Sequence, residues 1–343
     1  MVWRLKLKRL FRKLKSYLQI ILQVQNLARS LFALSSTISV MMLYFLYPES
    51  YNITWKGRAY YIFFLWLALL ENALNWGKIN VKIDALKSKR FLASAIVAFL
   101  PITYILIVDF FEVDKIIIDS FPKRYGMSIW AESMPLTIEY IILAALFSLT
   151  VILAYGKRGL RYLALPISLS WAIGTIFLID NLYPFGEFTP FQMIVPATSM
   201  LASSILSLIG YNTELRGQIY GATTLRVWSN KGEATFGIAW PCSGVEGLIL
   251  YSVVTALFLR DSKFSQRQKI LCFLVGAAIT YFINALRIAM IFIIAIEYGV
   301  ASPEVQRFHG YYGPLFSVMW ILAYQLIIAA QSLWNERRTK GAT

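Results

Sequence analysis

The segment WPCSGVEGLILYSVVTALFLR, residues 240–260, determines how the rest of the chain is interpreted. It passes from a basic loop, through a cysteine flanked by proline, serine and glycine, into about eighteen apolar residues. A run of this length is typical of a helix that crosses roughly 30 Å of hydrocarbon. A helix that only crosses lipid needs no cysteine at its mouth. The segment therefore indicates a membrane protein with a reactive thiol at the water boundary.

Seven further apolar runs of similar length occur in the chain of 343 residues. They cover residues 27–48, 59–77, 91–110, 135–155, 161–180, 270–296 and 313–334. A hydrophobic content of 58% fits a polytopic membrane protein better than a soluble globule. Because lipid-exposed backbone must satisfy its own hydrogen bonds, each run is predicted to be a helix. We expect an all-α polytopic membrane protein with about eight transmembrane helices.

Three regions are predicted along the chain. Residues 1–26 carry seven Lys and Arg residues among apolar residues at helical spacing, which predicts a basic amphipathic helix at the membrane surface. A five-helix membrane region follows at 27–180. The catalytic region is expected at 181–343, with an external segment at 181–240 and three helices within 242–334. The net charge of +15 is distributed over short loops, so a nucleic-acid partner is not expected.

The apolar segment FQMIVPATSMLASSILSLIG, residues 191–210, has two interpretations. Its polar residues recur at near-helical spacing and are Gln192, Pro196, Ser199, Ser203 and Ser207. This stripe favours an outer-surface or re-entrant helix over a ninth span. With eight spans, 23 Lys and Arg residues lie in cytoplasmic segments and 9 in external ones, against 20 and 12 with nine spans. Eight spans with both termini cytoplasmic is therefore the better topology.

A small external β-hairpin is predicted directly before the cysteine helix. In the external segment 211–240, TTLRVWS and EATFGIAW alternate apolar and polar residues, and the NKG between them is a turn sequence.

Three residues that can do chemistry converge on the outer face in this topology. Cys242 opens one span, Arg287 lies late in the next, and His309, the single histidine of the sequence, follows that span. A helix N-terminus favours a thiolate, and an imidazole can take and return a proton. A guanidinium can stabilise a thiolate or an oxyanion. The set predicts nucleophilic catalysis.

Four neighbouring residues are predicted to orient these groups or the substrate, and they are Ser243, Gly244, Glu246 and Asn284. Glu246 lies one helical turn beyond Cys242, where it can pair with Arg287, and Asn284 shares a helix face with Arg287. Gly244 would allow a substrate backbone to approach closely. Helix packing remains the alternative role for both Glu246 and Arg287. Cys272, far from this face, is predicted to be a packing residue.

Two other functions are compatible with parts of the sequence. A transporter or channel could use a polar path of intramembrane charges, including Glu71 and Glu139. A lipid-linked acyl- or glycosyl-transferase could use the outer carboxylates of DFFEVD, residues 109–114. Neither function explains why cysteine, arginine and histidine meet on one face.

The motifs PCSGVEG, NALR and FHG, in this order at three membrane helices, resemble the exosortase/archaeosortase family. The resemblance covers chiefly residues 180–334. It implies a membrane cysteine transpeptidase in which Cys242 is the nucleophile, Arg287 the family arginine and His309 the third catalytic residue. A glutamate at 246 is not a general feature of the family, and an archaeal host is compatible with the resemblance.

The resemblance also implies a substrate and a location. Such an enzyme, at the outer face of the cytoplasmic membrane, cleaves a C-terminal signal of exported proteins and transfers the new C-terminus to a membrane lipid. The signal consists of a short motif, a transmembrane helix and a basic cluster. The partners are then an exported protein and a lipid acceptor. No metal or organic cofactor is expected, since one histidine and two distant cysteines make no metal-binding set.

The charge distribution yields a first testable prediction. Residues 211–240 and 298–312 should be external and 260–269 cytoplasmic, because Lys and Arg accumulate on the cytoplasmic side. A cysteine introduced at position 230 or 265, in a variant lacking Cys242 and Cys272, can be labelled with a membrane-impermeant maleimide on intact cells. Position 230 should react and position 265 should not. The reverse pattern would contradict the topology.

Overall fold

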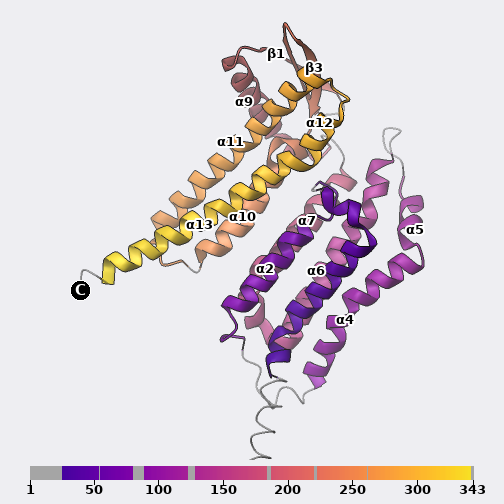
Figure 1. The fold of residues 1–343 in the computed structure, drawn as a ribbon, viewed down its shortest axis with the longest axis vertical. Coiled ribbons are helices and arrows are strands. Elements are labelled where there is room, and N and C mark those ends of the chain that lie inside the picture. The colour runs from indigo at the N-terminus through magenta and orange to yellow at the C-terminus, as the bar shows by residue number, and fades with distance from the viewer. Residues whose placement is uncertain are drawn as a thin grey trace, which may run out of the picture. The chain divides into compact units, whose positions relative to one another are not determined.

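The computed structural model describes residues 25–53, 55–79, 89–122, 128–183, 187–219, 222–260 and 262–340. The predicted surface helix at 1–26 lies outside these ranges except for its last two residues, which begin the helix Gln25–Leu46. The further helices, shown in Figure 1, are α2 (Tyr60–Leu74), α4 (Lys89–Phe110), α5 (Val113–Ser120), α6 (Ile129–Tyr162), α7 (Ala164–Leu182), α8 (Thr189–Gln192), α9 (Val195–Leu208), α10 (Val245–Arg260), α11 (Gln266–Tyr298), α12 (Pro303–Arg307) and α13 (Gly313–Lys340).

Seven helical segments within the described residues are long and apolar enough to cross a membrane. They are Gln25–Leu46, Lys89–Phe110, Ile129–Tyr162, Ala164–Leu182, Pro190–Leu208, Gln266–Tyr298 and Pro303–Gln331. This confirms the predicted all-α polytopic membrane protein. Two predicted spans form shorter helices, since α2 has 15 residues and α10 has 16. Both are shorter than the roughly 20 residues that a perpendicular span requires.

The chain folds as two compact units that interleave along the sequence. The first contains the described parts of Met1–Pro48, Tyr61–Lys115 and Ile141–Ser170. The second contains those of Glu49–Tyr60, Ile116–Tyr140 and Trp171–Thr343. Segment 49–60, although early in the sequence, therefore belongs to the same unit as the cysteine helix.

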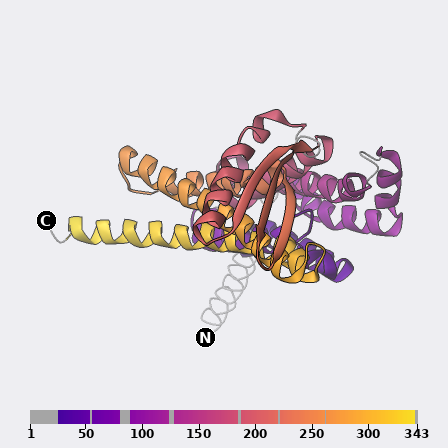
Figure 2. The ribbon, with the colours of Figure 1, turned by 90° about the horizontal axis from the view of Figure 1, so that it is seen from above.

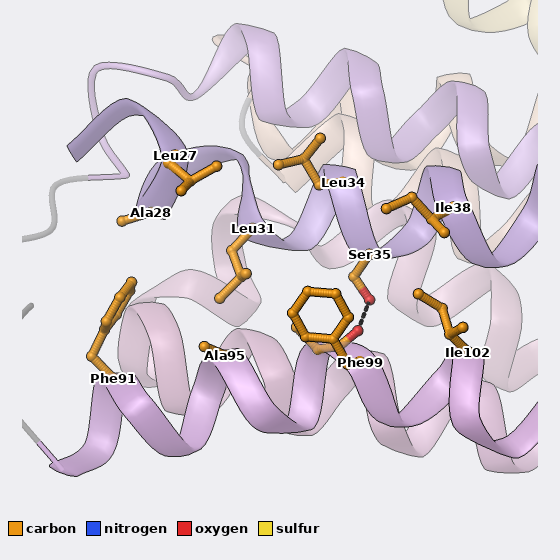
Figure 3. Close-up of a pocket in the computed structure, with 11 residues that line it drawn as sticks. Leu27, Ala28, Leu31, Leu34, Ser35, Ile38, Phe91, Ala95, Phe99 and Ile102 are labelled. Carbon is orange, nitrogen blue, oxygen red and sulfur yellow. Dashed lines mark hydrogen bonds between the residues drawn. The ribbon is translucent and has the colours of Figure 1, made fainter. Parts of the chain in front are cut away.

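The first unit is built around aromatic packing and loose apolar contacts. Phe64 stacks on Phe147 with ring centroids 5.0 Å apart, and Phe32 meets both rings edge-on. Figure 3 shows an apolar opening between the helix Gln25–Leu46 and α4, where the Ser35 hydroxyl donates to the Ala98 carbonyl at 2.5 Å. In α6, Gly156 has φ +73° and breaks the helix where the predicted span 135–155 ends.

In the second unit, α10, α11 and α13 pack closely around a glycine. Figure 1 shows α11 and α13 running alongside each other. The Tyr324 hydroxyl donates to the Cys272 carbonyl at 2.6 Å, and the Tyr251 hydroxyl to the Phe273 carbonyl at 2.8 Å. Gly276 lies beneath both rings. The backbone of Cys272 therefore takes part in the packing of α11 against α10 and α13.

A three-stranded antiparallel sheet replaces the predicted two-stranded hairpin. Its strands, in the order β1–β2–β3, are Asn212–Ile219, Ala222–Ser229 and Gly232–Ile238. The hairpin is confirmed as β2 and β3, joined by the two residues Asn230 and Lys231. Strand β1 was missed because its sequence, NTELRGQI, has no apolar alternation. Figure 2 shows the three strands side by side.

Helix α9 covers part of this sheet with the polar stripe seen in the sequence. The hydroxyls of Ser203 and Ser207 lie 2.7 and 3.1 Å from the Thr213 hydroxyl on β1. Pro190–Leu208 is long and apolar enough to span. The hydroxyl contacts between α9 and β1 favour a position of α9 at the membrane surface. The polar edge strand β1 can be solvated by water, whereas lipid would leave its backbone groups without hydrogen bonds.

Gly276 gives a stability prediction. A Cβ at this position would lie 2.2 Å from the Tyr251 hydroxyl oxygen and 2.4 Å from a Tyr324 ring carbon. Both hydroxyls are held by hydrogen bonds, so Gly276→Ala should destabilise the protein by about 1–3 kcal/mol despite the better helix propensity of alanine. A lower thermal midpoint in detergent would show this. Gly77→Ala, with no atom within 4 Å of the new Cβ, is the control and should melt like the wild type. Equal midpoints for the two variants would contradict the packing argument.

Candidate active site

Cys242 lies in a tight turn immediately before α10. The chain arrives extended at Ala239, forms a 3₁₀ turn over Trp240–Ser243, and passes through Gly244 into α10. Pro241 lies in the first positions of this 3₁₀ turn. The sequence analysis placed Cys242 at the start of the membrane helix. In the structure the cysteine precedes α10 by three residues and therefore lies before the first turn of this helix. We call residues 240–244 the thiol turn.

Gly244 is required for the conformation of the thiol turn. Its φ of +95° and ψ of 0° are left-handed, a region that favours glycine. A Cβ here would lie 3.0 Å from the Asn284 amide nitrogen. The space above Gly244 therefore holds Asn284, so this glycine shapes the turn and does not admit a substrate backbone as predicted.

Two side chains satisfy the carbonyl groups of the thiol turn. The Asn284 amide donates to the Cys242 carbonyl at 3.0 Å, and the Thr198 hydroxyl donates to the Ser243 carbonyl at 2.8 Å. Tyr281 contacts the Thr198 hydroxyl at 2.8 Å. The Ser243 hydroxyl donates back to the Trp240 carbonyl at 2.7 Å. Asn284 and Ser243 thus orient the turn, and the sequence analysis missed Thr198 and Tyr281.

The structure brings the predicted nucleophile and base together. The sulfur of Cys242 lies 3.5 Å from Nε2 of His309, although the residues are 67 positions apart. His309 is exposed and lies in a π-helical turn, Phe308–Tyr312, which follows α12. The cysteine is half-buried. This distance is within the range of a sulfur–nitrogen hydrogen bond.

Arg287 contacts the loop that carries the histidine. Its Nη2 donates to the His309 carbonyl at 3.1 Å. Gly313, the first residue of α13, packs on the arginine so closely that a Cβ would lie 2.6 Å from Nε. That Nε is buried and has no hydrogen-bond partner within the described residues. Arg287 therefore holds the histidine in place and keeps one donor unused.

Glu246 is paired with a residue that the sequence analysis did not consider. The Tyr60 hydroxyl, 186 positions earlier, donates to its carboxylate, and both side chains are buried. Glu246 and Arg287 line one small pocket, but no ion pair joins them in the described part of the chain. The possible Glu246–Arg287 ion pair is not formed among the described residues, where Tyr60 donates to the acid and the arginine donates to the His309 carbonyl.

Two buried ion pairs hold the segment that carries Tyr60. Arg58 binds Glu139 through Nη2 at 2.7 Å and Nε at 3.0 Å, and Lys56 binds Asp180 at 2.7 Å. Burial lowers the pKa of Lys56, and Asp180 partly restores it. Buried charges that are paired in this way fix geometry. They position segment 49–60 between α6 and α7.

The remaining intramembrane acid has a structural contact as well. The Glu71 carboxylate accepts a hydrogen bond from the backbone N–H of Leu165 at 3.1 Å, at the start of α7. Glu71 and Glu139 therefore both take part in helix packing.

Comparison with known proteins identifies the family of the chain. Residues 55–325 match the model of the transmembrane exosortase family, further toward the N-terminus than the resemblance at 180–334. The matched range includes Tyr60, Cys242, Arg287 and His309. Searches of curated proteins and of solved structures gave no match. The chain is thus a multi-pass membrane protein that belongs to the transmembrane exosortase family, whose membership supports a membrane transpeptidase in general.

Proposed function

We propose that this protein is a cysteine transpeptidase with Cys242 as its nucleophile. The observation that carries the proposal is the 3.5 Å separation of the Cys242 sulfur from His309 Nε2. Nucleophile and base within reach of each other, on separate elements, are the signature of covalent catalysis. The third element is Arg287, which binds the backbone of the histidine.

The first half-reaction forms a thioester. His309 takes the thiol proton, and the thiolate of Cys242 attacks a backbone carbonyl carbon of the substrate. The tetrahedral oxyanion collapses as the C–N bond breaks, and His309 returns the proton to the leaving amine. The new C–S bond holds the substrate on the enzyme, while the released fragment keeps the helix of the signal.

The second half-reaction releases the thioester. A head-group amine or hydroxyl of a membrane lipid attacks the carbonyl carbon and gives its proton to His309. The C–S bond breaks and the Cys242 thiolate regains that proton. The new C-terminus is then joined to the lipid. Cys242 is again a thiol and His309 is again neutral, so the enzyme is ready for another cycle.

Arg287 has two roles in this proposal. Through Nη2 it positions His309 opposite the sulfur. Its guanidinium charge also favours the thiolate and the developing oxyanion, because charge is stabilised more strongly in a site that excludes water. Tyr60 and Glu246 support the arginine side of the site by fixing the start of α10.

We further propose the location and partners expected from the charge distribution. The site faces outside at the cytoplasmic membrane, with both termini cytoplasmic. Its substrates are exported proteins whose C-terminus carries a short motif, a transmembrane helix and a basic cluster. A transporter is less well supported, since Glu139 is paired with Arg58 and Glu71 with a backbone N–H. A lipid-linked transferase that uses Asp109 and Asp114 is also less well supported, because it would give the Cys242–His309 pair no role.

The two cysteines provide a test of the nucleophile. Cys242→Ser should abolish processing of a co-expressed exported protein with such a signal, because a hydroxyl has a far higher pKa than a thiol and is not activated in the same way. Cys272→Ser should process normally, since Cys272 lies about four helical turns before Arg287 on α11. Loss of the C-terminal tag on a gel measures both. Activity in the Cys242 variant would contradict cysteine catalysis.

Arg287→Lys tests the proposed role of the guanidinium. Lysine keeps the charge but lacks the planar guanidinium fork, so it cannot hold the His309 carbonyl from the position that Nη2 occupies while it also presents a fixed donor to the oxyanion. Processing should fall by about 100-fold, almost as far as in Arg287→Ala. No thioester should accumulate in single-turnover mass spectrometry, because acylation itself is slowed.

The matched control is Arg307→Lys, an exposed arginine on α12 in the same loop, which should retain full activity. Near-normal processing by the Arg287→Lys variant would mean that only positive charge is required.

A further inference from the structure

A groove with a volume of about 270 Å³ begins at the cysteine–histidine pair. One wall consists of Phe236, Gly237 and Ile238 of β3, and the other of apolar residues of α11 with Val305 of α12. Successive residues of a strand point to opposite faces. Three consecutive residues of β3 line the groove, so the groove runs along the edge of this strand and not over one face of the sheet.

The hairpin geometry shows which backbone groups point into the groove. In a two-residue hairpin, Ser229 and Gly232 form a hydrogen-bonded pair, and such pairs alternate along the ladder. Counting from there, Glu233, Thr235 and Gly237 belong to non-hydrogen-bonded pairs. Their N–H and C=O groups point away from β2. Within the described residues, no backbone hydrogen bond from another element reaches them.

The two edges of the sheet differ. The outer edge, β1, carries the exposed pair Glu214–Arg216 and a register shift between Arg216 and Gln218. Charges and bulges are common devices that prevent another strand from adding to an edge. At its groove end, β3 carries Gly237 instead, an exposed residue without a side chain. A peptide backbone can therefore approach β3 closely.

We infer that the substrate residues on the acyl side of the scissile bond bind as an additional β-strand along β3. One of them pairs with Gly237, donating to its C=O and accepting from its N–H, and apolar side chains enter the groove. The strand delivers the scissile carbonyl to Cys242. This inference rests on the proposed function and specifies how its substrate is held.

A peptide fits the groove better than a lipid chain. The side walls are apolar and suit either, but a lipid chain would leave the N–H and C=O of Gly237 without partners, and unsatisfied buried polar groups are costly. An extended peptide supplies both partners. Lipid occupancy is the competing outcome of the test.

The probe is a pool of acetyl-tripeptidyl chloromethyl ketones with randomised side chains. The Cys242 thiolate displaces chloride from the probe, a C–S bond forms, and the thiol proton passes to His309 or the buffer. A second pool carries N-methylated backbone amides, and chloroacetone serves as a reagent without a peptide. The protein is the full chain with Cys272→Ser, so that Cys242 is its one thiol. Mass spectrometry measures the rate of alkylation.

Variants at the strand edge isolate the hydrogen bonds. Gly237→Pro removes the outward N–H, and no β2–β3 bond is lost. Gly237→Ala keeps the N–H, and its Cβ would make ordinary contact with Ala222 at 3.5 Å. Thr235→Pro makes the same change two residues further along the edge, outside the groove lining. It controls for any effect of proline on the fold.

The free-amide pool should alkylate Cys242 about tenfold faster than the N-methylated pool, the effect of losing one to two hydrogen bonds. Gly237→Pro should remove this advantage, while Gly237→Ala and Thr235→Pro keep it and chloroacetone reacts equally with all variants. Equal rates for the two pools, or an unaffected Gly237→Pro variant, would overturn strand addition and indicate lipid occupancy. Failure of the proposed function looks different, because Cys242→Ser would then retain processing.

Discussion

The candidate site depends on one constraint. Carbonyl groups of non-helical backbone at the ends of membrane helices need hydrogen-bond donors from elsewhere in the protein. Helices satisfy their own carbonyl groups, but some carbonyls of the thiol turn and of the π-helical turn Phe308–Tyr312 are bound by side chains. The carbonyls of Cys242, Ser243 and His309 are each bound by one side chain, from Asn284, Thr198 and Arg287 respectively. Two of these three donors lie on α11. This helix therefore fixes the distance between sulfur and imidazole.

This arrangement links stability and chemistry at the same residues. Removing a donor leaves a carbonyl unsatisfied, which costs about 1–3 kcal/mol when the group is buried. It also releases the turn that carries a reacting group, and small displacements of reacting groups are expensive in rate. Asn284 and Arg287 look like catalytic residues from their polarity alone. Their contacts show that both bind backbone carbonyls.

The sequence predicted what depends on local pattern. Apolar runs gave the membrane helices, alternation gave β2 and β3, and span order brought Cys242 and His309 to one face. The pairing of Tyr60 with Glu246 was not predictable, because 186 residues separate them and segment 49–60 has no motif. The same holds for Thr198, which the polar stripe of α9 contains but does not single out. The sequence around a polar residue does not reveal which distant residue its side chain contacts in the fold.

The β3 edge of the sheet differs from the rest of the site in how its backbone groups are satisfied. Around Cys242 and His309, side chains of the protein itself bind the exposed carbonyls, whereas the outward N–H and C=O of Gly237 face an apolar groove. The groove end of this edge, Phe236–Ile238, carries no charged residue, whereas a charged pair and a register shift lie on the opposite edge. An unprotected edge is a hazard unless a strand adds to it during function. Gly237 lies five residues before Cys242, so a strand added there would place its end beside the proposed nucleophile.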